Sequence, residues 1–163
     1  MYLRELPEVR RAVICVADGW VDAVVGYRAW EVWASDGEVH LSSITRRGIE
    51  WPQFGPLEKE CRCIRSLHRN DQLLNDHTCG IYAWAKPIIP YSPRFTGMMD
   101  DPSTYLAGEV LLWRSVTLHE RGYRGQFAQP GAFHIVREML PKHKLFIELA
   151  AHQFRVPIVQ VEI

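Results

Sequence analysis

The strongest constraint on the fold is a tight-turn signal between two runs of aromatic and β-branched residues. The runs cover residues 27–34 and 39–44, and residues 35–38 between them read Ser-Asp-Gly-Glu. Asp-Gly favours a two-residue hairpin turn because glycine adopts a positive φ at no steric cost. Both faces of the first run carry large apolar residues, Trp30 on one and Trp33 on the other. We therefore expect a hairpin inside a sheet rather than at a bare edge.

The rest of the chain predicts short strands alternating with short helices. In chain order these are a helix over 79–86, a strand over 108–119, a return strand over 123–129, helices over 133–140 and 141–154, and a closing strand over 156–161. Pro130 and Gly131 are expected to end the return strand, and Pro141 suits the first turn of the second C-terminal helix. This order predicts one α+β domain over residues 1–163. It is β-rich, with an antiparallel sheet or a partly closed barrel and one or two C-terminal helices.

Charge and composition exclude several classes of protein. Lys and Arg together number 19, as do Asp and Glu, so the formal net charge is zero and gives no strong nucleic-acid signal. No segment approaches the roughly 20 apolar residues of a membrane span, and the early apolar run over 12–17 is too short for a secretory signal. We therefore expect a cytoplasmic protein without a membrane partner. Four cysteines are too few for a disulfide scaffold.

A structural zinc site is one interpretation of the cysteine spacing. Cys61 and Cys63 form one pair of soft ligands, and His77 and Cys79 form a second pair after thirteen intervening residues. Zinc in structural sites takes four tetrahedral Cys or His ligands, although pairs spaced C-x-x-C are the common form. The alternative is that Cys61 and Cys63 are small buried residues of a strand, because free cysteine is among the most buried residue types.

A second interpretation is a cysteine nucleophile with a histidine base. Cys79 precedes the predicted helix over 79–86, where a thiol pKa is lowered by the helix N-terminus. His119, at the end of a predicted strand, could act as the base, and Glu120 or Gln126 could orient its ring. The alternative places Cys79 under the helix as a packed thiol and His119 at an exposed strand end.

Aromatic residues suggest a binding surface. The chain has six Trp and six Tyr, and Trp side chains bind rings, peptides and cations as readily as they fill a core. Arg28 could add a cation–π contact. The predicted ligand-binding residues are Tyr82, Trp84, Trp113, Arg114, Tyr123 and Arg124. They would line a pocket between the sheet and the proline-rich segment 87–103. The alternative is that at least three of the five tryptophans at 30, 33, 51, 84 and 113 belong to the core.

Two short resemblances are present. The Gly80-Ile81-Tyr82 segment is similar to one in which some ADP-ribosyltransferases place a Tyr against nicotinamide. A His–Tyr–Glu set would then be drawn from His68, Tyr82 and Glu120. His68 lacks the His-Gly or His-Thr surroundings of that family, which puts the set in doubt.

The second resemblance is to a group of small bacterial proteins. It rests on C-G-I-Y-A at 79–83 and on G-x-V-x-L-W-x-x-V-x-x-H-E-x-G-Y-R at 108–124. His77 stands where that group has a first Cys. The resemblance implies that the two segments belong to one unit, and the group has no established activity to transfer.

The sequence thus favours a non-enzymatic binding or regulatory domain with an aromatic-lined pocket, whose partner is a small molecule such as a nucleotide, a peptide or a protein. A cysteine-dependent enzyme is the alternative, and ADP-ribosyl transfer a weaker one. A Gly-rich phosphate loop, a G-x-S-x-G elbow and an H-E-x-x-H helix are all absent from the sequence.

Overall fold

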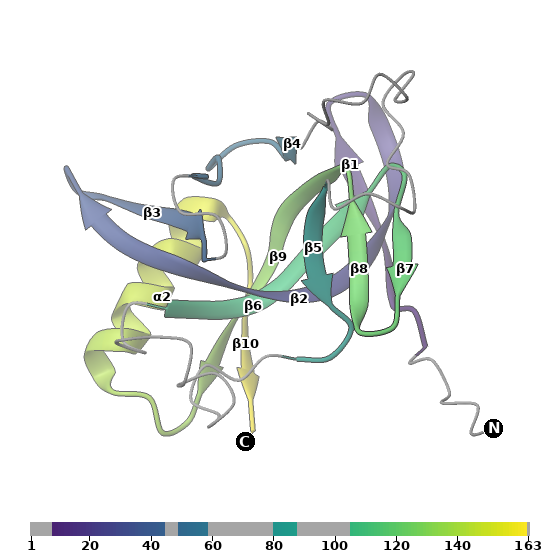
Figure 1. Ribbon diagram of the computed structural model, residues 1–163. Coiled ribbons are helices and arrows are strands. Elements are labelled where there is room, and N and C mark those ends of the chain that lie inside the picture. The colour runs from purple at the N-terminus through teal and green to yellow at the C-terminus, as the bar shows by residue number, and fades with distance from the viewer. Residues whose placement is uncertain (1–7, 45–48, 59–79, 88–104, 163) are drawn as a thin grey trace.

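The protein forms one open, mostly antiparallel β-sheet with a helix near its C-terminal end (Figure 1). The computed structural model describes residues 8–44, 49–58, 80–87 and 105–162. Along the main path the strand order is β10-β9-β6-β2-β5-β8-β7. Strands β1 and β3 pair with β2, and β4 pairs with β9. The expected β-rich α+β class is therefore confirmed, with an open sheet and a single C-terminal helix.

The strands differ widely in length, and β2 is the longest. Their bounds are β1 (Arg11–Val16), β2 (Gly19–Ser35), β3 (Glu38–Ser43), β4 (Leu57–Glu58), β5 (Ile81–Trp84), β6 (Tyr105–Trp113), β7 (Thr117–His119), β8 (Gly122–Gly125), β9 (Phe127–Val136) and β10 (Ile158–Val161). The helix, α2, spans Pro141–Phe154. All the strand pairs are antiparallel except β9 with β10.

The predicted hairpin is confirmed as β2–β3. Asp36 and Gly37 have φ values of 53° and 80°, and Ser35 pairs with Glu38 across them. Two central residues with positive φ are what a tight turn of this hand requires. β2 begins eight residues before the predicted run, at Gly19, and this length lets it pair with β1, β3, β5 and β6.

The predicted helix over 79–86 is wrong for its described residues, which form strand β5. Ile81 and Ala83 are buried, whereas Tyr82 and Trp84 are exposed. This period of two is that of a strand. β5 pairs with β8 along its whole length, from Ile81 opposite Gly125 to Trp84 opposite Gly122. Pairing with the distant strand β8 makes this segment a strand. The segment is too short for its own sequence pattern to distinguish a strand from a helix.

The sequence-based prediction is also wrong over residues 127–140. The predicted return strand over 123–129 divides into β8 and β9. Pro130 and Gly131 do not end it, and the expected helix over 133–140 is absent, because β9 continues to Val136. The register of β6 with β9 shifts at this point, because Glu109 pairs with Ala132 and Val110 with Pro130, which leaves Gly131 as the extra residue of a bulge in β9. Such a bulge accommodates proline, which has no N–H to give to the ladder.

The predicted strand over 108–119 is also interrupted. It divides into β6 and β7 because Arg114 and Ser115 both adopt a positive φ, 55° and 53°. β7 then folds back on β8 as a hairpin, with His119 opposite Gly122.

The C-terminal helix and the closing strand are confirmed as α2 and β10. Pro141 stands in the first turn of α2, as expected. The sequence pattern predicts that Leu145, Phe146, Leu149 and Ala150 form the buried stripe of this helix. That prediction is wrong for Leu145 and Leu149, which are exposed. The residues that α2 buries are Ile147, Ala150, Ala151 and Phe154.

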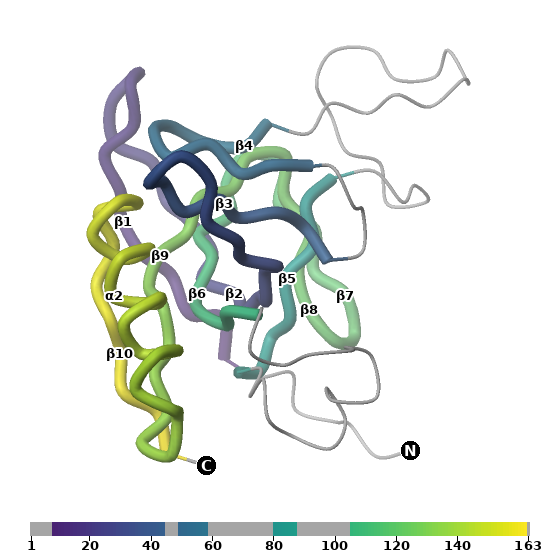
Figure 2. The backbone as a smooth tube through the Cα atoms, turned by 90° about the vertical axis from the view of Figure 1, so that its left-hand side faces the viewer, coloured from purple at the N-terminus to yellow at the C-terminus, as the bar shows by residue number. Residues whose placement is uncertain are grey.

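The core lies between α2 and one face of the sheet. Trp30 is fully buried and meets Trp51 and Phe133 edge to face, with ring centroids 5.5 Å and 5.7 Å apart. Phe133 in turn contacts Phe154 of α2. The two views place α2 at one end of the molecule and β5, β8 and β7 at the other (Figures 1 and 2).

Within the described part of the chain, no helix has the length and apolar character needed to cross a membrane.

Candidate functional site

Two large aromatic side chains are exposed on one face of β5. Tyr82 is 42% exposed and Trp84 is 50% exposed, while the residues that alternate with them are buried. Side chains two apart on a strand point to the same side, with Cα atoms about 6.8 Å apart. β5 therefore presents two rings on one face. The strand itself lies at the end of the molecule remote from α2 (Figure 2).

The neighbouring strands add a histidine and an arginine to this face. Tyr82 lies opposite Arg124 of β8, and Trp84 lies opposite Gly122. Gly122 is in turn opposite His119 of β7. Directly opposed residues of antiparallel strands share a face. We call the set Tyr82, Trp84, His119 and Arg124 the aromatic surface.

Direct contacts order this surface. The Tyr82 and His119 rings are stacked, with centroids 6.1 Å apart and planes 28° from parallel. The fully buried Arg124 guanidinium lies 6.0 Å from the Tyr82 centroid, within cation–π range. Tyr82 is thus held between a ring on β7 and a cation on β8.

Arg28, on the neighbouring strand β2, helps to hold β5 in place. β5 pairs with β2 only through Trp84 and Tyr27. Arg28 of β2 donates hydrogen bonds to the Tyr82 carbonyl and, over 3.0 Å, to Ser43 Oγ. Burial lowers the pKa of Arg28 to about 10, so it is charged at neutral pH. A guanidinium bonded both to a carbonyl of β5 and to a hydroxyl of β3 helps to fix the position of the strand that carries Tyr82.

Gly122 sets the separation of β8 and β5. A Cβ atom built on Gly122 would overlap the Ala83 carbonyl oxygen and lie 3.1 Å from Trp84 Cα. Only glycine permits this close approach of the two backbones. Sequence reasoning missed this role, although the glycine lies inside the motif at 108–124.

The pKa values of His119 and His40 are shifted in opposite directions. Burial, and then the charge of Arg124, hold the His119 pKa below its ordinary 6.5. A hydrogen bond to Glu50 raises the pKa of His40. His119 therefore resists protonation in the folded state, and its contribution to stability declines as the pH falls from 6.5 through its folded pKa. For His40 the added stability is present below pH 6.5 and is lost as the pH rises through its folded pKa.

We expect NMR titration of the ring Cε1–H signals to place the His119 midpoint below 6.5 and the His40 midpoint above it. Each histidine serves as the control for the other. The reverse order of midpoints would contradict the described surroundings of both rings.

Three predicted ligand-binding residues lie outside the aromatic surface. Trp113 is buried and stacks on Phe127, with centroids 5.8 Å apart. Arg114 lies over the same Phe127 ring. Tyr123 is buried and alternates with Arg124, so it points to the opposite side of β8. The expectation that at least three of the five tryptophans are core residues is confirmed by Trp30, Trp51 and Trp113.

The cysteine-based predictions fall largely on residues that the structure does not describe. The four predicted zinc ligands, Cys61, Cys63, His77 and Cys79, all lie outside the described residues. Among residues that are described, no group of three or more His, Cys, Asp and Glu could hold a metal ion. The Cys79–His119 pair is described only at His119. Zinc binding and a cysteine nucleophile thus both stay predictions.

The ADP-ribosyltransferase-like set is also described only in part. Tyr82 and Glu120 belong to the described residues, whereas His68 does not. The set therefore also stays a prediction. Residues 82–83 of the first motif segment pair with residues 123–124, at the end of the second, because β5 pairs with β8.

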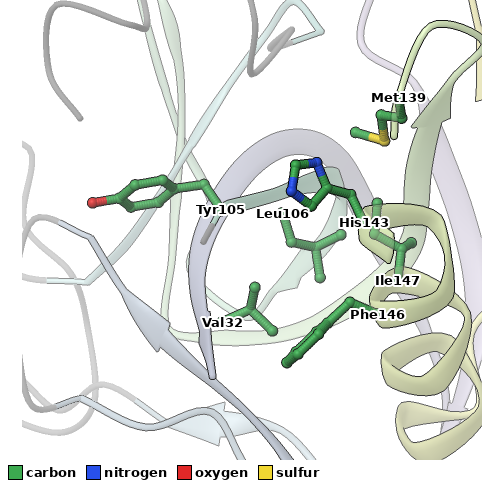
Figure 3. Close-up of a pocket in the computed structure, with 7 residues that line it drawn as sticks. All are labelled: Val32, Tyr105, Leu106, Met139, His143, Phe146 and Ile147. Carbon is green, nitrogen blue, oxygen red and sulfur yellow. The ribbon is translucent and has the colours of Figure 1, made fainter. Parts of the chain in front are cut away.

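A small pocket opens at the other end of the molecule, between α2 and strands β2 and β6 (Figure 3). Val32, Leu106, Phe146 and Ile147 give it an apolar lining, and His143 also borders it. Its volume of about 10 Å³ is room for one water molecule. It is too small for a ligand. Of the segment 87–103 that was expected to cover the predicted pocket, only Pro87 belongs to the described residues.

Neither family models, nor curated proteins, nor solved structures give a match to this chain. The candidate site is accordingly defined by its own geometry.

Proposed function

We propose that this chain is a non-enzymatic binding domain whose ligand lies on the aromatic surface. The observation that carries this proposal is the exposure of Tyr82 and Trp84, 42% and 50%, on one face of a single strand. Adjacent exposed rings leave apolar area in water that a partner could bury at about 25 cal/mol per Å². The same rings in a core would have stabilised the fold instead.

Preorganisation supports the same function. Tyr82 is held by the ring of His119 and the guanidinium of Arg124, and its carbonyl accepts a hydrogen bond from Arg28. A surface whose side chains are already fixed loses little conformational entropy when a ligand binds. Rigid aromatic residues next to arginine are also the residue types that carry most of the energy in binding interfaces.

The shape of the surface favours a ligand with an exposed planar group. Tyr82 and Trp84 stand on an open strand face, and a flat ring can stack on either of them. A nucleobase and an aromatic side chain of a peptide share this property. The ligand is therefore expected to lie across the strands rather than to enter a cavity.

The test uses two ring-bearing probes, adenosine monophosphate and N-acetyltryptophanamide, followed through backbone amide shifts. We expect at least one probe to shift residues 81–84 and 117–124 selectively. Replacing Tyr82 or Trp84 with Leu keeps an apolar side chain but removes the ring. Each change should weaken binding roughly fivefold or more, since stacking contributes about 1–3 kcal/mol per ring.

The matched control is Trp33→Leu. Trp33 is also exposed, at 39%, but lies on the β2–β3 hairpin and stacks on His40. This variant should bind both probes as the unchanged protein does. Shifts centred on Trp33, or unchanged binding by the Tyr82 and Trp84 variants, would overturn the proposed function.

A further inference from the structure

The aromatic surface lies in the most basic part of the described chain. Segments 80–87 and 114–125, which form β5, β7, β8 and their turns, contain four basic residues and one acidic residue, Glu120. Of the basic residues, Lys86 and Arg121 are exposed beside the aromatic surface. Arg124 is fully buried against Tyr82, and Arg114 lies over Phe127, outside the surface. The whole chain has no net charge, so the charge is unevenly distributed. A local basic field of this kind attracts an anion, although the total charge does not indicate one.

The opposite charge gathers elsewhere. The β2–β3 hairpin carries Asp36 and Glu38 at its turn, and Glu50 contacts His40 of β3 through a 2.5 Å ion pair. The exposed aromatic residue of that hairpin, Trp33, therefore has acidic neighbours. The exposed Phe54 ring also has a cation beside it, with the Arg155 guanidinium 5.2 Å from its centroid. Tyr82 and Trp84 differ from it because they place two exposed rings on one strand face.

Two exposed cations lie at the Trp84 end of the surface. The Ala85 amide donates a hydrogen bond of 3.0 Å to the Arg121 carbonyl, which brings the turn after β7 against the end of β5. Lys86 follows Ala85 directly, and both Lys86 and Arg121 are exposed. A ligand stacked on Trp84 thus has two positive side chains next to it.

We propose that the aromatic surface binds single-stranded nucleic acid, with bases stacked on Tyr82 and Trp84 and phosphates directed to Lys86 and Arg121. This inference rests on the proposed function and names its ligand. Successive rings on a strand face are a general platform for unpaired bases. Paired bases are stacked inside a duplex, so a duplex cannot offer their faces to these rings. The surface should select single strands.

The expected binding is governed by stacking more than by charge. With two phosphates engaged, the logarithm of the binding constant should fall with the logarithm of the salt concentration with a slope of about −1.4. Removal of one ring should weaken binding roughly 5- to 150-fold. Replacement of both Lys86 and Arg121 with Gln should flatten the salt dependence and leave the preference for single strands unchanged.

Fluorescence anisotropy with labelled 12-nucleotide single strands of RNA and DNA tests this, with the matching duplex as a third probe. The fourth probe is a labelled peptide of the same length that alternates Glu and Tyr. Tyr82→Leu and Trp84→Leu should lose affinity, Tyr82→Phe should retain it because the ring remains, and Trp33→Leu should match the unchanged protein. The RNA and DNA probes distinguish the two natural sources of this chemistry.

Each outcome decides between the two proposals. A duplex bound as tightly as the single strands, or single strands bound equally by the Leu variants, overturns the nucleic-acid inference. Ring-dependent binding of the peptide alone overturns it too, and leaves the proposed function standing. If no probe binds in a ring-dependent way, both are wrong. Tyr82→Phe keeps the test decisive even if a Leu variant does not fold.

Discussion

Trp30→Ala is expected to lower the free energy of unfolding by roughly 3–5 kcal/mol. Trp30 is fully buried and packs edge to face against Trp51 and Phe133, so its removal leaves a cavity at the centre of the core. Natural domains are stable by only about 5–15 kcal/mol, and the variant should therefore be close to unfolding. Urea denaturation followed by circular dichroism measures the change.

Trp33→Ala is the matched control for Trp30. The two residues lie three apart on β2, but Trp33 is 39% exposed and its ring contacts only His40 among the aromatic side chains described. Its loss should cost less than about 1 kcal/mol. Similar losses in the two variants would mean that Trp30 is not at the centre of the core and that the described packing is wrong.

Gly122→Ala is expected to have the largest effect on the candidate site. The added methyl group would overlap the Ala83 carbonyl oxygen, which is backbone and cannot rotate away. Overpacking of side chains costs about 1–3 kcal/mol, and a clash with backbone should exceed that range. The pairing of β8 with β5 must then shift, which displaces Tyr82 from His119 and Arg124. We expect both lower stability, measured by urea denaturation, and loss of ring-probe binding.

Gly131→Ala controls for the general effect of replacing a strand glycine. Its added Cβ would meet Leu111 Cγ and Cδ2 at 3.0 Å and 3.1 Å, and a leucine side chain can move by a few tenths of an ångström. Alanine also lowers the entropy of the unfolded chain, which offsets part of the cost. This variant should stay within about 1 kcal/mol of the unchanged protein and should keep its binding. Equal losses at Gly122 and Gly131 would argue against the close approach of β5 and β8.

Local sequence patterns were sufficient where a segment determines its own structure. Asp36 and Gly37 favour a tight turn whatever surrounds them, and Pro141 fits the first turn of a helix in any context. They predicted the β2–β3 hairpin and the start of α2. Phe133 and its neighbours were misassigned because Pro130 and Gly131 indicate a break, whereas a bulge at Gly131 lets β9 continue.

The candidate site could be predicted only in part because it depends on whether residues 79–86 form a helix or a strand. In a helix, Tyr82 and Trp84 would be about 200° apart around the axis and could not form one surface. In the strand they share a face and lie beside His119 and Arg124. The pairing partner that decides this, β8, lies some forty residues further along the chain. The burial of Trp113 likewise depends on its distant neighbour Phe127.

The most direct test of ligand binding at the aromatic surface is the side-chain Nε1–H spectrum of the six tryptophans during addition of a 12-nucleotide single strand and of the ring-bearing peptide. Binding at the surface predicts that the Trp84 signal moves in a saturable way with at least one ligand while those of Trp33 and the buried Trp30 stay fixed. A stationary Trp84 signal at saturating concentrations of both, or movement of Trp33 instead, would contradict the account.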